Sequence, residues 1–206
     1  MNSNTLRRTV AGPAGPLDVA IDEPRDVAVR GTALVCHPHP LHGGTLDNKV
    51  AQTLARAWVQ AGWRAVRFNF RGVGGSAGAW DEGRGEIDDA IAAIDVEAPD
   101  GDLAVAGFSF GGYVASHVAA RLAASGRAVR EVVLIAPATG NFSVAPAPAG
   151  TLVVHGEHDD VVPLSATLDW ARPQSLPVVV VPGGGHFFHG QLPLLKSIVL
   201  RHLGAA

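Results

Sequence analysis

Six short apolar runs separated by segments of helical periodicity constrain the fold of this 206-residue chain more than any other feature. The runs are rich in valine and mostly continuous, as in strands that are buried on both faces of a sheet. They are Ala33–Cys36, Ala65–Phe70, Leu103–Ala106, Val132–Ala136, Leu152–Val154 and Val178–Val181. Alternation of such strands with helices predicts an α/β fold, in which a mostly parallel central sheet has helices on both faces.

The segments between these runs repeat apolar residues at spacings of three and four, which predicts amphipathic helices. The first stripe is followed by Gly62, the expected C-cap. The stripes are Leu46–Ala61, Ile87–Ile94, Val114–Leu122, Leu164–Ala171 and Leu192–Leu203. The start of the chain is different, because Leu6–Val10 and Leu17–Ile21 flank the turn sequence AGPAG. We expect these two segments to form an antiparallel hairpin at one edge of the sheet.

Composition excludes several other classes of protein. Apolar residues make up 47% and charged residues 17%, which excludes a long disordered chain. The net charge is −3 and the sequence has no Lys/Arg block, so we expect no nucleic-acid partner. The longest apolar run, Val132–Ala138, is far shorter than the ~20 residues of a membrane helix.

The length suits one compact domain, so we expect residues 1–206 to form a single α/β domain. The N-terminal residues lack the apolar stretch of a signal peptide, and the lone Cys36 is compatible with a reducing cytosol. These observations together predict a cytoplasmic protein that does not enter the membrane. Its oligomeric state stays open between monomer and homodimer.

In an open parallel sheet, ligands bind beyond the carboxyl ends of the strands, so catalytic residues are expected just after these runs. The run Leu103–Ala106 leads into Gly107-Phe108-Ser109-Phe110-Gly111 and then into a helical stripe. This is a G-x-S-x-G nucleophile elbow in its strand–turn–helix context. Small residues two before and two after the serine let chain segments pass close together. Ser109 is therefore the candidate nucleophile.

An acid and a base follow two later runs. After Leu152–Val154 come the adjacent carboxylates Asp159 and Asp160, either of which could orient an imidazole. After Val178–Val181, three glycines lead to His186, with His189 as a competitor. A neutral imidazole can take a hydroxyl proton near pH 7, so we predict that His186 is the general base.

The order Ser109, then an aspartate, then His186 is the chain order of the α/β-hydrolase triad. The sequence resembles that superfamily from Cys36 to about Leu203, and most of all small bacterial serine hydrolases (predicted carboxylesterases) related to dienelactone hydrolase. In that family the acid is the fifth residue of an H-G-x-x-D-x-x-V-P string. The resemblance therefore implies that Asp159, not Asp160, completes the triad.

The loop after Ala33–Cys36 reads His37-Pro38-His39-Pro40-Leu41-His42. In the superfamily this loop supplies one backbone N–H of the oxyanion hole. Proline has no N–H, so the donor here is His39 or Leu41. Aligning the loop with the superfamily's H-G-x string favours His39, and Phe110 N–H is the expected second donor. A metal site on His37, His39 and His42 is the alternative, and we predict none because no Cys or carboxylate ligand is near.

The glycine string after the second apolar run, the lone cysteine and Trp80 are expected to have structural roles. The string Gly72–Ala77 fits a relaxed dinucleotide fingerprint, but the next helical stripe begins too late for one. It is similar to the family's R-G-x-G-x-S turn, a structural loop beside the active site. Cys36 ends an apolar strand and is expected to be an inert buried residue. Trp80 is expected to pack against the fold, with the border of the substrate cleft as an alternative.

The function implied is a serine hydrolase that cleaves small carboxylic esters through an acyl-enzyme intermediate, without a cofactor. Only about fifteen residues separate Ala136 from Leu152, where many superfamily members insert a cap, so no cap or lid is expected. Three alternatives stay open. They are an acyl-thioesterase with the same triad, a non-catalytic binding protein on this scaffold, and a nucleotide-binding oxidoreductase.

Overall fold

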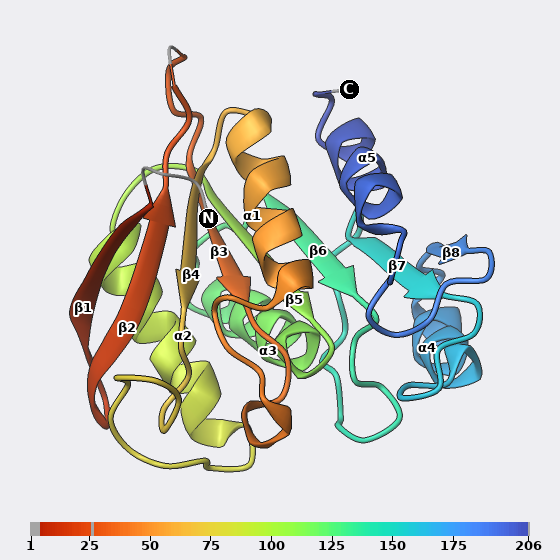
Figure 1. Ribbon diagram of the computed structural model, residues 1–206, viewed down its shortest axis with the longest axis horizontal. Coiled ribbons are helices and arrows are strands. Elements are labelled where there is room, and N and C mark those ends of the chain that lie inside the picture. The colour runs from red at the N-terminus through yellow and green to blue at the C-terminus, as the bar shows by residue number, and fades with distance from the viewer. Residues whose placement is uncertain (1–4, 26, 206) are drawn as a thin grey trace.

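The computed structural model describes residues 5–25 and 27–205, and across these residues it contains one eight-stranded sheet (Figure 1). The order of strands across the sheet is β1-β2-β4-β3-β5-β6-β7-β8. The strands are β1 Leu6–Gly12, β2 Gly15–Asp22, β3 Thr32–Cys36, β4 Arg64–Phe68, β5 Leu103–Phe108, β6 Glu131–Ile135, β7 Leu152–Gly156 and β8 Val178–Val181.

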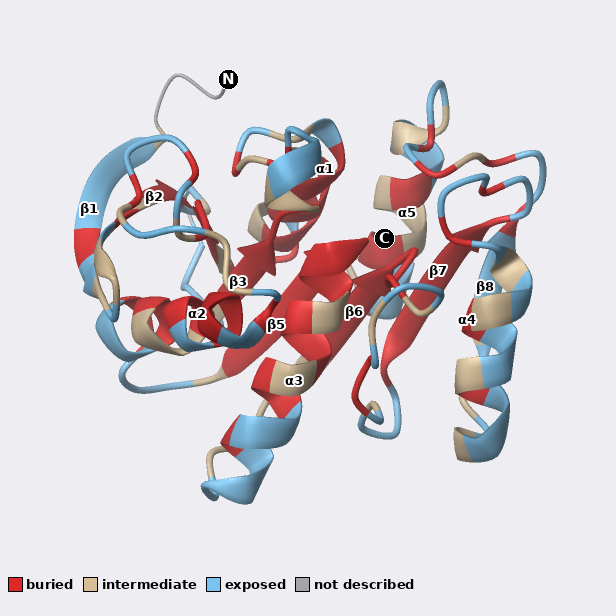
Figure 2. Cartoon of the chain, turned by 90° about the horizontal axis from the view of Figure 1, so that it is seen from below, coloured by how far each residue is buried: buried red, intermediate tan, exposed pale blue. Residues whose placement is uncertain are grey.

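Helices cover both faces of this sheet. They are α1 Lys49–Gln60, α2 Arg84–Glu97, α3 Phe110–Ala124, α4 Leu164–Ala171 and α5 Leu192–His202, with short 3-10 turns at Pro40–His42 and Arg172–Gln174. Helices α1 and α5 pack with one face of the sheet, and α2 and α3 pack with the other (Figures 1 and 2). Gly62 adopts a left-handed φ of 84° just after α1, as expected near a helix C-terminus.

The fold prediction is confirmed, including the hairpin. Strands β1 and β2 pair antiparallel, and β2 pairs antiparallel with β4. All the other pairings, from β4 through β8, are parallel. The segment between β6 and β7 contains no helix, so the fold has no cap or lid there.

One strand departs from the expected burial. The run Val178–Val181 was predicted to be buried on both faces, but Val179 and Val180 are exposed in β8. The reason is position, because β8 is an edge strand and has only β7 as a neighbour. A continuous valine run predicts a strand, but it does not say whether that strand lies at the centre or at the edge of the sheet.

The core has two halves, one on each face of the sheet. In the central strands β3, β5 and β6, alternate residues such as Leu34 and Val35 enter opposite halves. These strands are the most buried part of the fold (Figure 2). Among the residues that the structure describes, no helix combines the length and apolarity needed to cross a bilayer.

Candidate active site

Ser109 occupies a strained turn between the central strand β5 and helix α3. Its backbone has φ 56° and ψ −119°, a conformation that residues with a side chain rarely adopt. The Ser109 N–H donates to Ile135 O of the neighbouring strand β6, which holds the turn in place. The predicted elbow is therefore present at the carboxyl end of the sheet.

The two motif glycines explain why the turn requires its sequence. A Cβ on Gly107 would lie 2.0 Å from Gly111 O, and a Cβ on Gly111 would lie 2.2 Å from Cys36 O. Real Cβ atoms do not approach backbone oxygens so closely. The G-x-S-x-G pattern thus follows from the close passage of β3, β5 and α3, which is the steric reason anticipated from the sequence.

Three predicted side chains meet at this turn. His186 Nε2 lies 3.0 Å from Ser109 Oγ, and His186 Nδ1 lies 2.7 Å from Asp159 Oδ2. All three residues are nearly buried, with relative exposures of 7% for Ser109, 3% for His186 and 8% for Asp159. The structure thus brings the serine, the imidazole and the carboxylate into one hydrogen-bonded chain.

Both carboxylate oxygens of Asp159 have polar partners within the protein. Oδ1 accepts the backbone N–H groups of Val161 (3.0 Å) and Val162 (2.7 Å), and Oδ2 faces His186. Burial alone would raise the pKa of Asp159, but the hydrogen bonds with His186 and with these two N–H groups outweigh it and keep the pKa below its ordinary value. The carboxylate is therefore ionised wherever the protein is folded near neutral pH.

The two competing residues lie outside this chain of contacts. Asp160 is exposed, although it directly follows Asp159. His189 is also exposed, and its ring contacts Phe187 at a centroid distance of 5.9 Å. The structure thus brings Asp159 and His186 to the serine, and leaves Asp160 and His189 at the surface.

The backbone N–H groups of Phe110 and His39, the two expected oxyanion donors, have no acceptor among the described residues. Phe110 opens helix α3, where N–H groups have no partner within the helix and the helix dipole favours a negative charge. In the loop after β3, the Leu41 N–H donates to His39 Nδ1 at 3.2 Å. Of the two candidate loop donors, Leu41 is therefore occupied and His39 is available.

His37 and His39 use their ring nitrogens within the protein. His37 Nε2 accepts the Phe70 N–H at 3.1 Å, so its Nδ1 carries the proton and donates to Pro38 O at 2.7 Å. Burial lowers the pKa of His37 to about 4, against the opposing effect of the Pro38 hydrogen bond. Across residues 5–25 and 27–205, no three His, Cys, Asp or Glu side chains are arranged to hold a metal ion.

Aromatic rings gather around Phe110, next to the elbow serine. Its ring lies 5.1 Å from Trp80, 5.1 Å from Phe142 and 5.2 Å from His39, measured between centroids. The rings of Trp80, Phe142 and His39 are partly exposed. Trp80 therefore packs onto the fold, as predicted, and also presents ring surface beside the site.

The glycine-rich loop after β4 is structural, as expected. Helix α2 begins only at Arg84, well after Gly72, so no helix opens inside the glycine string. Arg71 forms an ion pair with the buried Asp89 of α2 at 2.8 Å, which ties the loop to that helix. Cys36 is also fully buried, and burial raises the pKa of its thiol far above the ordinary value.

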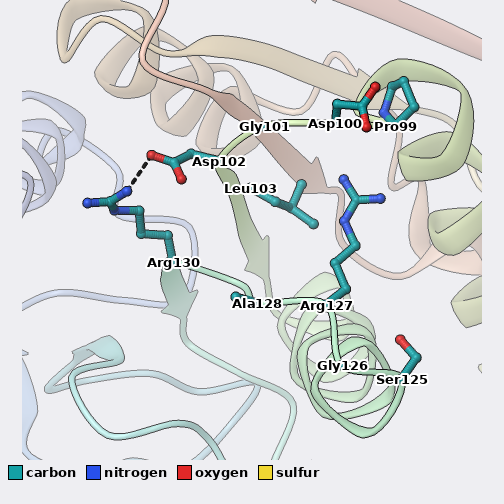
Figure 3. A pocket seen from close by; sticks show the side chains of 10 residues that line it. All are labelled: Pro99, Asp100, Gly101, Asp102, Leu103, Ser125, Gly126, Arg127, Ala128 and Arg130. Atoms are coloured by element: carbon teal, nitrogen blue, oxygen red, sulfur yellow. Dashed lines mark hydrogen bonds and ion pairs between the residues drawn. The ribbon is translucent and has the colours of Figure 1, made fainter.

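A cavity of about 670 Å³ lies at the other end of the sheet (Figure 3). It is lined by residues 99–103, 125–128 and 130, which precede β5 and β6. Asp102 and Arg130 form an ion pair of 2.5 Å at its edge. Because Ser109 follows the opposite end of β5, six residues away, about 20 Å separates the two places. This cavity is not part of the serine site.

Comparison with known proteins points to a hydrolase. Residues 87–155, about a third of the chain, match the family model described as a thioesterase domain. That segment includes Ser109 and ends before Asp159. An uncharacterized protein of Rickettsia prowazekii (strain Madrid E) is 33% identical over 173 residues, which cover 76% of this chain and 71% of the relative.

Two solved structures are also similar over nearly their whole length. A lidless α/β serine hydrolase from Xanthomonas campestris has 39% identity and a TM-score of 0.90, covering 99% of this chain and 95% of that one. An α/β serine hydrolase homologue from Coxiella burnetii has 38% identity and a TM-score of 0.87, covering 98% of each chain. The sheet and its serine elbow define a hydrolase architecture without a lid. The chain belongs to the α/β-hydrolase superfamily.

One further residue touches this site and was not predicted from the sequence. His155 is fully buried in β7, and its Nε2 lies 3.3 Å from Asp159 Oδ2. The apolar run ended at Val154, so His155 was taken as the first residue after the strand, although β7 continues to Gly156. Its place within a buried strand is the signal that could have identified it.

Proposed function

We propose that this hydrolase cleaves small carboxylic esters with Ser109 as nucleophile, His186 as general base and Asp159 as the acid that orients His186. The hydrogen-bonded chain from Ser109 Oγ through His186 to Asp159 Oδ2 carries the proposal. With His186 Nδ1–H donating to the carboxylate, Nε2 keeps a lone pair to accept the serine proton. This is the tautomer that general-base catalysis needs.

The proposed reaction has two halves. Ser109 Oγ attacks the ester carbonyl and its proton moves to His186 Nε2, while the N–H groups of Phe110 and His39 bind the oxyanion. The alcohol leaves with the proton from His186, and an acyl group remains on Ser109. Water, deprotonated by His186, then attacks the acyl-enzyme, and the carboxylic acid is released as Ser109 recovers its proton. No step uses a cofactor.

Two features support small substrates with short acyl chains. No helix covers the site between β6 and β7, so no lid encloses a long chain. Ser109 itself exposes only 7% of its surface, which favours acyl groups narrow enough to reach Oγ. We therefore expect acetate and butyrate esters to be cleaved faster than long-chain esters. The reverse order of rates would contradict this expectation.

The experiment that tests the mechanism is labelling with a fluorophosphonate, read by intact mass. Wild type is expected to gain one adduct and Ser109→Ala none. Ser143→Ala is a matched control, because Ser143 is an exposed serine in the loop that carries the aromatic Phe142. It should gain one adduct like wild type. If correctly folded wild type gained none, the non-catalytic binding protein would become the better interpretation.

Acyl-thioester hydrolysis is the second candidate, and the thioesterase-domain match over residues 87–155 favours it. Esters and thioesters share the tetrahedral intermediate, so the same triad serves both. Matched butyryl esters and butyryl thioesters distinguish them by kcat/KM. A larger value for the thioester would move the assignment to thioesterase without changing the roles of the three residues.

A further inference from the structure

His155 touches the proposed triad without belonging to it. It lies in β7, is fully buried, and its Nε2 contacts two oxygens: Val162 O at 2.9 Å and Asp159 Oδ2 at 3.3 Å. Its other ring nitrogen, Nδ1, is buried without a partner in the described part of the chain. This arrangement is unusual, because buried polar atoms are nearly always hydrogen-bonded.

The contacts fix the protonation of the ring. A lone pair on Nε2 would face two oxygens and be repelled by both, so Nε2 carries the proton. A proton on Nδ1 as well would leave a buried charge with an unsatisfied donor, which is costly. Burial lowers the pKa of His155, and the Val162 hydrogen bond and the Asp159 charge oppose this only in part. His155 is therefore a neutral donor.

The hydrogen bond from His155 stabilises the short loop from Asp159 to Val162. Val162 receives His155 at its carbonyl oxygen, while its own N–H donates to Asp159 Oδ1. Asp159 Oδ2 faces His186 at 2.7 Å and has His155 Nε2 as a second polar neighbour at 3.3 Å, while Oδ1 accepts two backbone N–H groups. Three hydrogen bonds and the close approach of the His155 ring thus surround the two carboxylate oxygens. The rotation of Asp159 about its side chain is thus fixed by its surroundings.

We propose that His155 is a positioning residue, a neutral imidazole that keeps Asp159 Oδ2 directed at His186. The inference rests on the proposed function, because it concerns the same triad. The proposed role differs from simple packing, because it requires the Nε2–H donor. A side chain of similar volume that lacks a donor should not replace His155. The titratable groups that face His155 are Asp159 and His186.

The test compares His155→Leu with His155→Gln. Leucine fills the space without a donor, whereas glutamine places an amide N–H at about the position of Nε2. Turnover of a short-chain ester is measured from pH 5 to 9, and kcat is scaled to the fraction of protein that fluorophosphonate labels. His155→Leu is expected to lower kcat by about tenfold or more with KM little changed, and His155→Gln to recover most of it.

The acid side of the pH profile gives a second readout. Without His155, Asp159 Oδ2 loses a polar N–H neighbour at 3.3 Å, so the carboxylate charge acts more strongly on His186. The pH at which half of the activity is lost is therefore expected to rise in His155→Leu and to return toward wild type in His155→Gln. Equal kcat and an equal profile in all three proteins, or equal losses in both variants, would overturn the proposal.

A spectroscopic measurement separates this inference from the proposed function. The His186 Nδ1 proton, held at 2.7 Å from Asp159 Oδ2, should give a strongly downfield proton resonance. His155→Leu is expected to shift or broaden this resonance, and His155→Gln to retain it. If wild type showed neither labelling nor turnover, the proposed function would fail, while an unchanged resonance in His155→Leu would reject the positioning role independently.

Discussion

The Leu41 N–H donates to Nδ1 of His39, two residues before it, over 3.2 Å. This short-range bond decides which N–H groups of the loop after β3 are free. Pro38 and Pro40 have none, and the N–H groups of His42 and Gly44 both donate to His39 O. Burial and the neighbouring His42 lower the pKa of His39, which keeps its ring neutral and able to accept. The His39 N–H has no acceptor among the described residues, which supports its proposed role as an oxyanion donor.

The first prediction tests that backbone donor directly. His39 has φ −54°, close to the value that proline imposes, so His39→Pro removes the N–H with little strain at this residue. We expect kcat to fall by roughly 10²–10³-fold, the usual effect of losing one oxyanion donor. His39→Ala keeps the N–H and should lose much less. Steady-state kinetics on one short-chain ester give kcat for both variants. Equal losses of kcat in His39→Pro and His39→Ala would show that the imidazole ring matters and the backbone N–H does not.

The second prediction concerns the two adjacent acids. In Asp159→Asn the amide would place N–H groups against His186 Nδ1–H, so the imidazole loses its partner and its productive tautomer. We expect kcat to fall by about 10⁴-fold. Asp160→Asn removes the same charge one residue further along, at an exposed position, and should stay near wild type. A large loss in Asp160→Asn would reverse the assignment of the acid.

The third prediction concerns the stability of the elbow. Gly111→Ala places a Cβ 2.2 Å from Cys36 O and 2.5 Å from His37 O, so β3 and α3 must move apart. We expect a loss of at least about 2 kcal/mol in the free energy of unfolding. Gly140→Ala is the control, since its Cβ would meet nothing closer than 3.7 Å. Urea denaturation of both variants measures the difference, and similar stabilities would contradict the steric argument.

The fourth prediction follows from His37, whose pKa is lowered by burial to about 4. The unfolded chain takes up a proton at this residue near pH 6.5, and the folded chain does so only near pH 4. More protons are bound in the unfolded state between these values, so stability should fall as the pH is lowered through this window.

The contribution of His37 is expected to reach about 3 kcal/mol. Thermal unfolding at pH values from 7 to 4 measures it, with His37→Gln as the comparison because glutamine does not titrate. The dependence of Tm on pH should be shallower in His37→Gln. Parallel curves for the two proteins would show that another group causes the acid sensitivity.

Much of the fold could be predicted because continuous apolar runs determine buried strands. The central runs Leu103–Ala106 and Val132–Ala136 lie in β5 and β6, as expected. The run Ala65–Phe70 ends as a strand at Phe68, because the last two residues leave the ladder to carry the loop. The position of a strand in the sheet depends on contacts far apart in the sequence, and for that reason the exposure of β8 was not predicted.

The site was predictable where its chemistry requires a local pattern. The elbow needs glycines at fixed spacing, so Ser109 could be located from the sequence alone. Only the resemblance favoured His39 over Leu41, because the hydrogen bond that occupies the Leu41 N–H forms in the folded loop and leaves no pattern in the sequence. His155 opens the H-G-x-x-D-x-x-V-P string, but its contacts with Asp159 and Val162, four and seven residues later, exist only once the loop after β7 has folded back on the strand.

The placement of His186 just after β8 makes the proposed activity depend on an edge strand of the sheet. Strand β8 has four residues, one neighbouring strand and two exposed valines, whereas Ser109 follows the fully buried β5. Edge segments of this kind open locally at a lower free energy than a central sheet. Heat or denaturant should therefore separate the imidazole from the serine while the central strands stay protected from hydrogen exchange, so the enzyme would become inactive before it unfolds.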